Sequence, residues 1–345
     1  KTLITIFGLI YLFPLFEKFS INLVYKNDFS NYSFTQSLIF FILLGAFLFI
    51  IDLPFDIYFT FILEKRYGFS NITPKIYISD KIKTIILSIL IGLPLLYLFI
   101  LILNNFKFFF LPLSLIIIFV TFLMNIIYPS FIIQLFYKLE KLENENLKEK
   151  ILKISEKEGL KFENVYVMNA SSRSSHTNAF FSGLGKTKKI VFYDTLIKNH
   201  AEDEILSIFA HELGHYKKGH IFKSFILMSI FIIFVMFLFN ILYYTKISEV
   251  FYACKYCIDL KILYTTIFLS SIFSYFEFYV NSISRKFEFE SDEIATKLTD
   301  KTSMIKSLKR LFKENLSNLF PHPLYSKFKY THPPPIERIE HILNL

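Results

Sequence analysis

The sequence predicts a mainly α-helical protein that crosses a membrane several times and carries two polar regions. Of its 345 residues, 53% are apolar and only 19% are charged, a composition too apolar for a soluble protein of this length. The apolar residues form long blocks, and polar stretches occupy residues 138–220 and 284–345. The net charge of +9 is spread around the apolar blocks without interleaved aromatic residues. We therefore expect the lipid bilayer, and no nucleic acid, as a partner.

Six segments reach or approach the roughly 20 apolar residues that a helix needs to cross a bilayer. They are residues 2–16, 34–62, 84–103, 108–136, 221–244 and 262–283. Because the last two lie between the polar regions, both polar regions are expected on the same side of the membrane. The loop at 63–83 shares that side and carries five basic residues, which indicates the cytosol by the positive-inside rule.

This spacing divides the chain into four parts. We expect transmembrane helices at 1–137, a polar catalytic region with a small β-sheet at 138–220, two more transmembrane helices at 221–283, and a second polar catalytic region at 284–345.

The first polar region is expected to combine helices with a pair of short strands. The pattern predicts helices at 137–142 and 147–154 and strands at 165–168 and 189–194, with a turn at 183–185 between the strands. The edge of such a sheet can accept an extended peptide as a further strand.

A five-residue motif, His211-Glu212-Leu213-Gly214-His215, predicts a metal site. Residues 201–210 before it have the pattern of a helix, with acidic residues in the first turn. Two histidines four residues apart on a helix lie one turn above the other on the same face, so both can bind one zinc ion. The glutamate between them can take a proton from a zinc-bound water.

A hydrolytic zinc site commonly has three protein ligands, and the helix after the last span offers the third. Glu288 and Asp292 are four residues apart and share a face, so Glu288 could bind the metal while Asp292 bonds a ligand histidine. Alone, this segment is better interpreted as a charged helix capping a membrane span, and only the histidine pair favours the metal-binding interpretation. Glu290 points elsewhere and is interpreted as a solvated charge, and His220 follows His215 at a spacing unsuited to a third ligand.

The remaining histidines and cysteines carry weaker signals. His176 could compete for the metal, and His200, His322 and His341 are interpreted as surface residues. Cys254 and Cys257 lie in a loop on the non-cytosolic side. They could form a disulfide in an oxidising lumen, but we expect two free cysteines.

Several sequence blocks together resemble the type I CAAX prenyl proteases, the integral-membrane zinc enzymes of the a-factor-converting kind. The blocks follow the family's order and cover almost the whole chain: Ile-Leu-Glu-Lys-Arg-Tyr-Gly-Phe-Ser (62–70), Arg-Ser-Ser-His-Thr-Asn-Ala-Phe (173–180), Lys-Lys-Ile-Val-Phe-Tyr-Asp-Thr-Leu (188–196), His-Glu-Leu-Gly-His-Tyr-Lys-Lys-Gly-His (211–220), Arg-Lys-Phe-Glu-Phe-Glu-Ser-Asp (285–292) and Thr-His-Pro-Pro (331–334) followed by Glu-Arg (337–338). The bacterial HtpX-type membrane proteases share the zinc motif and the glutamate helix but are shorter and lack several of these blocks.

The resemblance implies a fold of seven membrane helices enclosing a chamber, closed on the cytosolic side by a zincin-like metalloprotease domain. The first span of this chain resembles the family's second, which implies that the family's first helix is missing here and leaves the closure of the chamber in question.

The resemblance also implies roles for individual residues. His211, His215 and Glu288 match the ligands of one zinc ion, and Glu212 matches the general base. The other matching positions are Asn178 and Ala179, which hold the substrate backbone, His332, which stabilises the developing oxyanion, and Asp292 and Arg338, which support the ligands. From the residues alone, His332 would be a histidine at the entry of a helix.

By this resemblance the chain is expected to remove the C-terminal tripeptide from farnesylated CAAX proteins, as a monomer in the endoplasmic reticulum membrane or nuclear envelope. One alternative is an HtpX-like quality-control protease for membrane proteins. Another is a membrane scaffold without activity, although the intact Glu212 argues against it.

Overall fold

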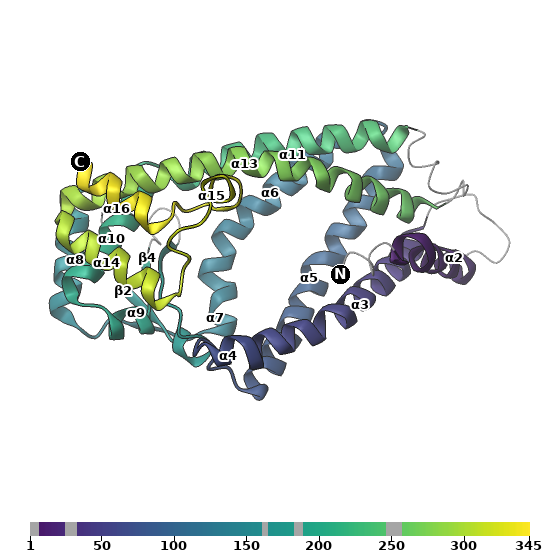
Figure 1. Ribbon diagram of the computed structural model, residues 1–345. Coiled ribbons are helices and arrows are strands. Elements are labelled where there is room, and N and C mark those ends of the chain that lie inside the picture. Colours follow the sequence, from purple (N-terminus) through teal and green to yellow (C-terminus); the bar gives the residue numbers. More distant parts are fainter. Residues whose placement is uncertain (1–6, 25–32, 161–164, 183–188, 246–256) are drawn as a thin grey trace. The chain divides into compact units, whose positions relative to one another are not determined.

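The computed structural model describes residues 7–24, 33–160, 165–182, 189–245 and 257–345 (Figure 1). The chain forms two compact units. The first unit comprises residues 1–63, 81–119 and 229–273, and the second comprises residues 64–80, 120–228 and 274–345. The four-part division expected from the sequence stays a prediction.

Long apolar helices dominate the chain and confirm a mainly helical membrane protein. The described helices before residue 138, with their short π-helical turns, are η1 (Gly8–Leu12), α2 (Phe13–Val24), α3 (Phe34–Tyr58), η2 (Phe59–Leu63), α4 (Glu64–Arg66), α5 (Pro74–Asn105), α6 (Phe110–Ile127), η3 (Tyr128–Ile132) and α7 (Ile133–Phe136). Two further long helices are α11 (His220–Tyr244) and α13 (Ile258–Leu298).

Four stretches of the described residues are long and apolar enough to cross a membrane: Phe34–Arg66, Pro74–Asn105, Phe110–Phe136 and His220–Tyr244. They overlap four of the six predicted spans, those at 34–62, 84–103, 108–136 and 221–244. Their large apolar side chains are mostly exposed, as expected for surfaces that face lipid. The predicted span at 262–283 is helical within α13 but is not among these four, and the predicted span at 2–16 begins outside the described residues.

The second unit contains a four-stranded sheet with strand order β1-β2-β4-β3. Its strands are β1 (Leu139–Lys141), β2 (Val165–Met168), β3 (Ala179–Ser182) and β4 (Lys189–Tyr193). Strands β2 and β4 pair in parallel and the outer pairs are antiparallel, so β3 pairs with β4 alone. The two predicted strands are confirmed, and the expected turn at 183–185 lies outside the described residues.

The expected helix at 137–142 is wrong, because strand β1 occupies residues 139–141. The backbone amide of Lys138 donates to Asn169 Oδ1 at 2.7 Å, and the amide of Leu142 donates to the Val165 carbonyl at 2.9 Å. A run this short fits the helical and the extended period equally, and pairing with β2 decides the outcome. The other predicted helix lies within α8 (Glu145–Lys157).

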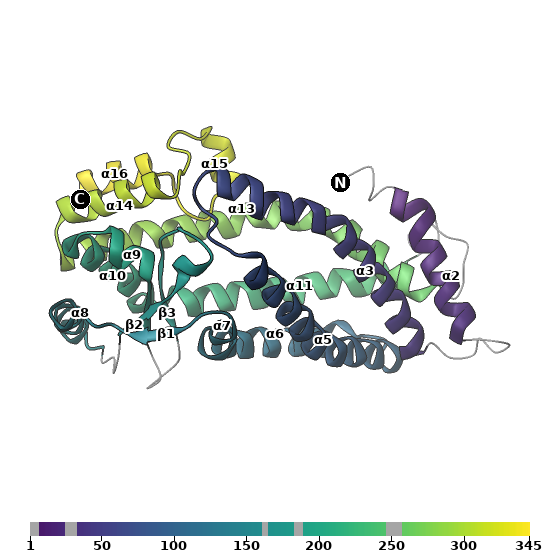
Figure 2. The same cartoon turned by 90° about the horizontal axis from the view of Figure 1, so that it is seen from below.

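The helices of the second unit pack on the sheet and on one another (Figure 2). They are the 3₁₀ turn η4 (Ala170–Ser172), α9 (Asp194–Asn199), α10 (Glu202–Lys217), α14 (Lys301–Glu314), α15 (Pro323–Lys329) and α16 (Pro335–Asn344), together with α8. Ile151, Phe192, Phe209 and Leu213 are fully buried in the core that joins α8 and α10 to the sheet.

Helices α10 and α13 cross at very close range at Gly214. A Cβ atom added there would lie 2.9 Å from Ser291 Cα, closer than real Cβ contacts. Glycine therefore permits the approach that brings the acidic residues of α13 beside the histidines of α10.

Cys257 is disulfide-bonded, so the expectation of two free cysteines is wrong. Cys254, the other cysteine of the chain, lies outside the described residues.

Candidate metal centre and substrate cleft

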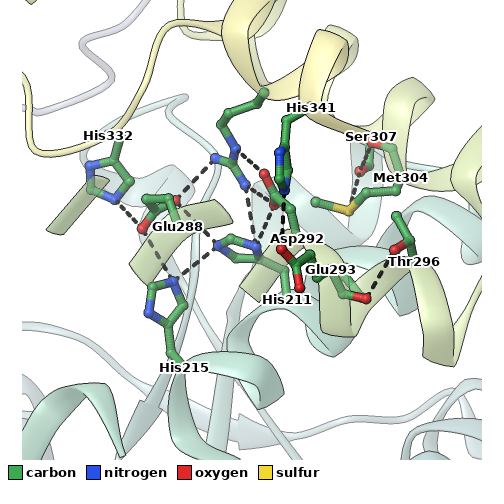
Figure 3. A network of polar contacts seen from close by, with 12 residues as sticks. His211, His215, Glu288, Asp292, Glu293, Thr296, Met304, Ser307, His332 and His341 are labelled. Carbon is green, nitrogen blue, oxygen red and sulfur yellow. Dashed lines mark hydrogen bonds and ion pairs between the residues drawn. The ribbon is translucent and has the colours of Figure 1, made fainter. Parts of the chain in front are cut away.

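Helix α10 brings the two histidines of the motif together. Its first turn carries three acidic residues, and the side chain of Glu204 accepts a hydrogen bond from the Ala201 amide at 3.0 Å. One turn separates His211 from His215, and their Nε2 atoms lie 3.2 Å apart (Figure 3). The helix is fixed by apolar packing on one face, so both imidazoles are held on the other.

Helix α13 adds Glu288 to this pair. Its Oε1 atom lies 3.2 Å from His215 Nε2, and its Oε2 atom lies 3.4 Å from His211 Nε2. Among the described residues, His211, His215 and Glu288 form the group whose ligand atoms lie close enough to hold one metal ion. Glu288 is buried.

The spacing of the two histidine nitrogens and the Glu288 carboxylate fits a tetrahedral metal. For zinc–ligand bonds of about 2.0–2.1 Å, tetrahedral geometry places neighbouring ligand atoms about 3.3 Å apart. The two Nε2 atoms lie 3.2 Å apart, and the carboxylate approaches His215 Nε2 with Oε1 at 3.2 Å and His211 Nε2 with Oε2 at 3.4 Å, all close to that value. Glu288 Oε2 is buried, and its contacts are ion pairs with His211 Nε2 at 3.4 Å and with Arg338 at 3.2 Å. His211, His215 and Glu288 therefore fit a zinc ion.

Asp292 and Arg338 orient His211 from behind. Asp292 Oδ1 lies 2.8 Å from His211 Nδ1, so a proton on Nδ1 leaves the Nε2 lone pair free for a metal. Arg338, from α16, donates from Nε to Asp292 Oδ2 at 2.8 Å and from one Nη to Oδ1 at 2.5 Å. Its other Nη lies 3.2 Å from Glu288 Oε2, so one guanidinium holds both carboxylates of α13.

His220 and Glu290 orient His215 in the same manner, which the sequence interpretation does not anticipate. The Nδ1 atoms of His220 and His215 lie 3.1 Å apart, and His220 Nε2 lies 3.1 Å from Glu290 Oε2. The His220 ring is buried and stacks on Phe287, with ring centroids 4.0 Å apart. Glu290 is therefore not a solvated charge.

These contacts allow one consistent assignment of protons. If His215 uses Nε2 as a ligand, its Nδ1 carries the proton and donates to His220 Nδ1. His220 is then protonated on Nε2 and donates to the Glu290 carboxylate. Glu290 thus fixes the tautomer of His220, and His220 fixes the tautomer of His215.

The three ligands and Glu212 line a cavity of about 870 Å³ within the second unit. Asn178, Ala179 and His332 line it as well, so the structure brings these predicted site residues to one cavity. Burial raises the pKa of Glu212 above its ordinary value, with His211 and His215 acting in the opposite direction. A raised pKa suits a carboxylate that accepts a proton and later returns it.

Ala179 begins the edge strand β3, and Asn178 directly precedes it. The Tyr193 amide donates to the Asn178 carbonyl at 3.0 Å, which fixes the start of the strand on β4. Ahead of it, His176 Nδ1 lies 2.8 Å from Asn315 Oδ1, and the His176 ring stacks on Phe69. His176 therefore holds the approach to β3 and is not part of the metal cluster.

The loop between two predicted spans also supports the approach to β3. The guanidinium of Arg173 donates to both carboxylate oxygens of Asp80, at 2.7 and 3.0 Å, and lies over the Tyr137 ring. The Asn71 amide donates to the Arg173 carbonyl at 3.0 Å. The segment that precedes the edge strand is thus fastened to residues 64–80.

His332 is largely exposed, whereas Asp292 is buried and held by its contacts with Arg338 and His211. His332, in the loop between α15 and α16, points to the cluster with Nε2 3.4 Å from Glu288 Oε1, and its side chain is 66% exposed (Figure 3). It can therefore meet a ligand in the cavity. Burial alone would raise the pKa of Asp292, but Arg338 and His211 lower it below its ordinary value and keep the carboxylate charged.

Of the other histidines, His200 departs from the sequence interpretation. The sequence predicts it at the surface, but it is buried beside Glu314. His322 is exposed, and His341 is half-buried near Glu293.

Two family models together match nearly the whole chain. Residues 141–345 match Peptidase family M48, and residues 1–138 match the CAAX prenyl protease N-terminal region, described as five membrane helices.

Characterised relatives show the same similarity. CAAX prenyl protease 1 of Saccharomyces cerevisiae is 33% identical over 322 residues, covering 88% of this chain and 71% of the yeast protein. The human CAAX prenyl protease 1 homolog is 31% identical, covering 98% of this chain and 80% of its own length. The crystal structure of S. mikatae Ste24p superposes with a TM-score of 0.89 at 31% identity, covering 98% of this chain and 82% of that one.

Proposed function

Because the chain belongs to peptidase family M48 and carries the N-terminal region of the CAAX prenyl proteases, we propose that it removes the C-terminal tripeptide from prenylated CAAX proteins in a zinc-dependent reaction. The family makes it a membrane-embedded metallopeptidase. Zinc as the metal, the farnesylated substrate and the residue roles are the proposal.

One observation carries this function. Three potential ligands, a carboxylate with a raised pKa and an edge strand line the same cavity. A peptide that adds to β3 as a further strand would run past the cluster with its backbone held by main-chain hydrogen bonds. Metal-dependent peptide hydrolysis uses this combination of an extended substrate, a metal and a base.

In the proposed mechanism His211, His215 and Glu288 hold the zinc ion. When bound, zinc would lower the pKa of a water and polarise the scissile carbonyl. Glu212 takes the proton of the attacking water and later gives it to the leaving amine. Asn178 and Ala179 hold the substrate backbone, and His332 donates a hydrogen bond to the oxygen that becomes negatively charged.

Three features support a cytosolic site in the endoplasmic reticulum membrane or nuclear envelope. Two predicted spans between the polar regions would put both on one side, and the basic loop at 63–83 favours the cytosol for that side. The disulfide-bonded Cys257 lies in the loop on the opposite side by the same parity. Disulfides persist in oxidising compartments such as the lumen of the endoplasmic reticulum. We propose that the protein acts there as a monomer.

The test is cleavage of a synthetic farnesylated CAAX peptide by purified protein. We expect release of the C-terminal tripeptide, weaker cleavage of the unprenylated peptide, and none after treatment with a zinc chelator. Glu212→Gln should keep the metal and abolish cleavage, because the amide cannot accept the proton.

Two outcomes would contradict the proposal. If zinc is bound and unprenylated membrane proteins are cut while the farnesylated peptide survives, the protein is a quality-control protease. If neither zinc nor cleavage is found, it is a scaffold.

A further inference from the structure

Residues 316–330 expose an unusual amount of apolar surface for a region outside the predicted spans. Between 47% and 76% of the surface is exposed for each of Leu316, Leu319, Phe320, Leu324, Tyr325 and Phe328. By contrast, no large apolar side chain in the described part of residues 138–219 is exposed to this degree. Most other exposed side chains of this kind lie on the long apolar helices. In this chain, then, large exposed apolar side chains are chiefly a mark of lipid-facing surface.

This segment, which we call the apolar arm, is fastened to one part of α13. Asn281 Nδ2 donates to the Phe328 carbonyl at 2.7 Å, and the rings of Phe278 and Phe328 lie 4.7 Å apart. Lys329 pairs with Glu277 at 2.8 Å. These α13 residues form the cytosolic end of the predicted span at 262–283, and Figures 1 and 2 show α15 beside α13. The contacts therefore hold the arm at the depth where this span would leave the bilayer.

The arm is too short to cross a membrane. Its only helix, α15, has seven residues and begins at Pro323, whereas a spanning helix needs about 20. Lys327 is exposed on α15 beside the apolar side chains. Apolar and aromatic side chains with adjacent lysines are the composition of segments that lie in the interface, with apolar groups among the acyl chains and cationic groups at the lipid phosphates.

We propose that residues 316–330 insert into the cytosolic leaflet as an interfacial anchor. The partner is the bilayer itself, with its phosphate headgroups facing Lys327 and its upper acyl chains contacting Phe320 and Leu324. The anchor ends two residues before His332, so it holds the loop that carries His332 close to the membrane surface. This inference rests on exposure and on the contacts with α13, and it does not require the proposed peptidase activity.

The absence of tryptophan from the chain makes a direct test possible. Phe320→Trp introduces a single fluorophore at the most exposed large apolar side chain of the arm, which is 76% exposed. The protein is reconstituted into phosphatidylcholine vesicles that carry bromine either high or low on the acyl chains. Two control variants are Phe119→Trp, on the lipid-exposed surface of α6, and Lys153→Trp, on the exposed face of α8.

We expect the Phe320→Trp emission to be quenched at least twofold more by bromine high on the chain than by bromine near its end, as for an interfacial residue. Phe119→Trp should be quenched by bromolipid, and Lys153→Trp should not. Quenching of Phe320→Trp no stronger than that of Lys153→Trp would overturn the proposal. A blue-shifted emission without bromolipid quenching would also overturn it, because protein would then cover the arm.

Discussion

Replacing His220 with phenylalanine should weaken metal binding without unfolding the catalytic region. The His220 ring packs against Phe287 with an angle of 8° between the ring planes, and a phenyl ring can keep this stacking. What the substitution removes is the acceptor 3.1 Å from His215 Nδ1 and the link to Glu290. His215 then lacks the partner that holds its Nδ1 proton and its ring orientation.

The size of the effect follows from the role of this hydrogen bond. Removing a hydrogen-bond partner of a metal-ligating histidine typically lowers metal affinity about 10–100-fold, which is about 1.4–2.7 kcal/mol. His220→Asn should restore part of the affinity, because its side-chain oxygen can replace the Nδ1 acceptor. His341→Phe is the matched control, since His341 also packs beside a phenylalanine of α13 but contacts no proposed ligand.

The assay is competition for Zn²⁺ between the purified protein and a chelator of known affinity, read beside the melting temperature. Zinc affinity of His220→Phe equal to that of His341→Phe, with unchanged melting, would refute the proton assignment. Equal decreases in affinity for His220→Phe and His220→Asn would show that an acceptor at position 220 does not restore metal binding, which would contradict the role assigned to the hydrogen bond with His215 Nδ1.

Three further predictions concern packing, pH and the approach to the edge strand. Gly214→Ala should destabilise the protein by about 1–3 kcal/mol and lower its zinc content, because the added methyl group pushes α10 away from the backbone of α13. Gly92→Ala is the control: the space around Gly92 is open, so its zinc content should stay unchanged. Burial lowers the pKa of His200 below 6.5, so the folded state resists protonation of this side chain and the protein should lose stability as the pH falls below 6.5. Melting curves at about pH 7.5 and about pH 5.5 measure this loss. His200→Phe should remove it, because phenylalanine does not titrate. Arg173→Lys cannot reproduce the two-pronged contact with Asp80 and should raise KM for the peptide while zinc content stays constant; unchanged KM would mean that this contact does not position β3.

The sequence predicts those features that depend on the spacing of residues along a helix and on the number of membrane spans between two segments. Two histidines four residues apart must share a helix face, and Glu288 and Asp292 obey the same rule on α13. Counting the predicted spans leads to the expectation that both helices lie on one side of the membrane, which would make a joint site possible. The structure brings these four side chains within contact of one another, as the spacing requires.

What the sequence does not predict depends on pairing between distant segments. Strand β1 has only three residues and exists because β2 offers a partner, and β3 escapes prediction for the same reason. The burial of His200 likewise depends on α14, more than 100 residues later in the chain, since Glu314 lies beside it.

His220 shows how a local signal can be misread. A residue five positions after His215 would point away from it on a continuous helix. Helix α10, however, ends at Lys217, and Gly219 takes a positive φ of 66° before α11 begins at His220. The chain turns there, and His220 faces back to His215. The Lys-Gly-His sequence after the motif is therefore the signal that could have revealed this contact, because glycine is the residue that permits such a turn.

Helix α13 supplies an acidic partner to every part of the metal centre. Glu288 faces both histidines, Asp292 holds His211, and Glu290 reaches His215 through His220. The apolar arm is attached around Asn281, seven residues before Glu288, which is about 10 Å along the helix axis. A single helix thus carries both the membrane-proximal attachment and the carboxylates. A movement of this part of α13 along its axis would displace all three acidic residues together. Restraining its depth in the bilayer would therefore also restrain the geometry of the metal centre.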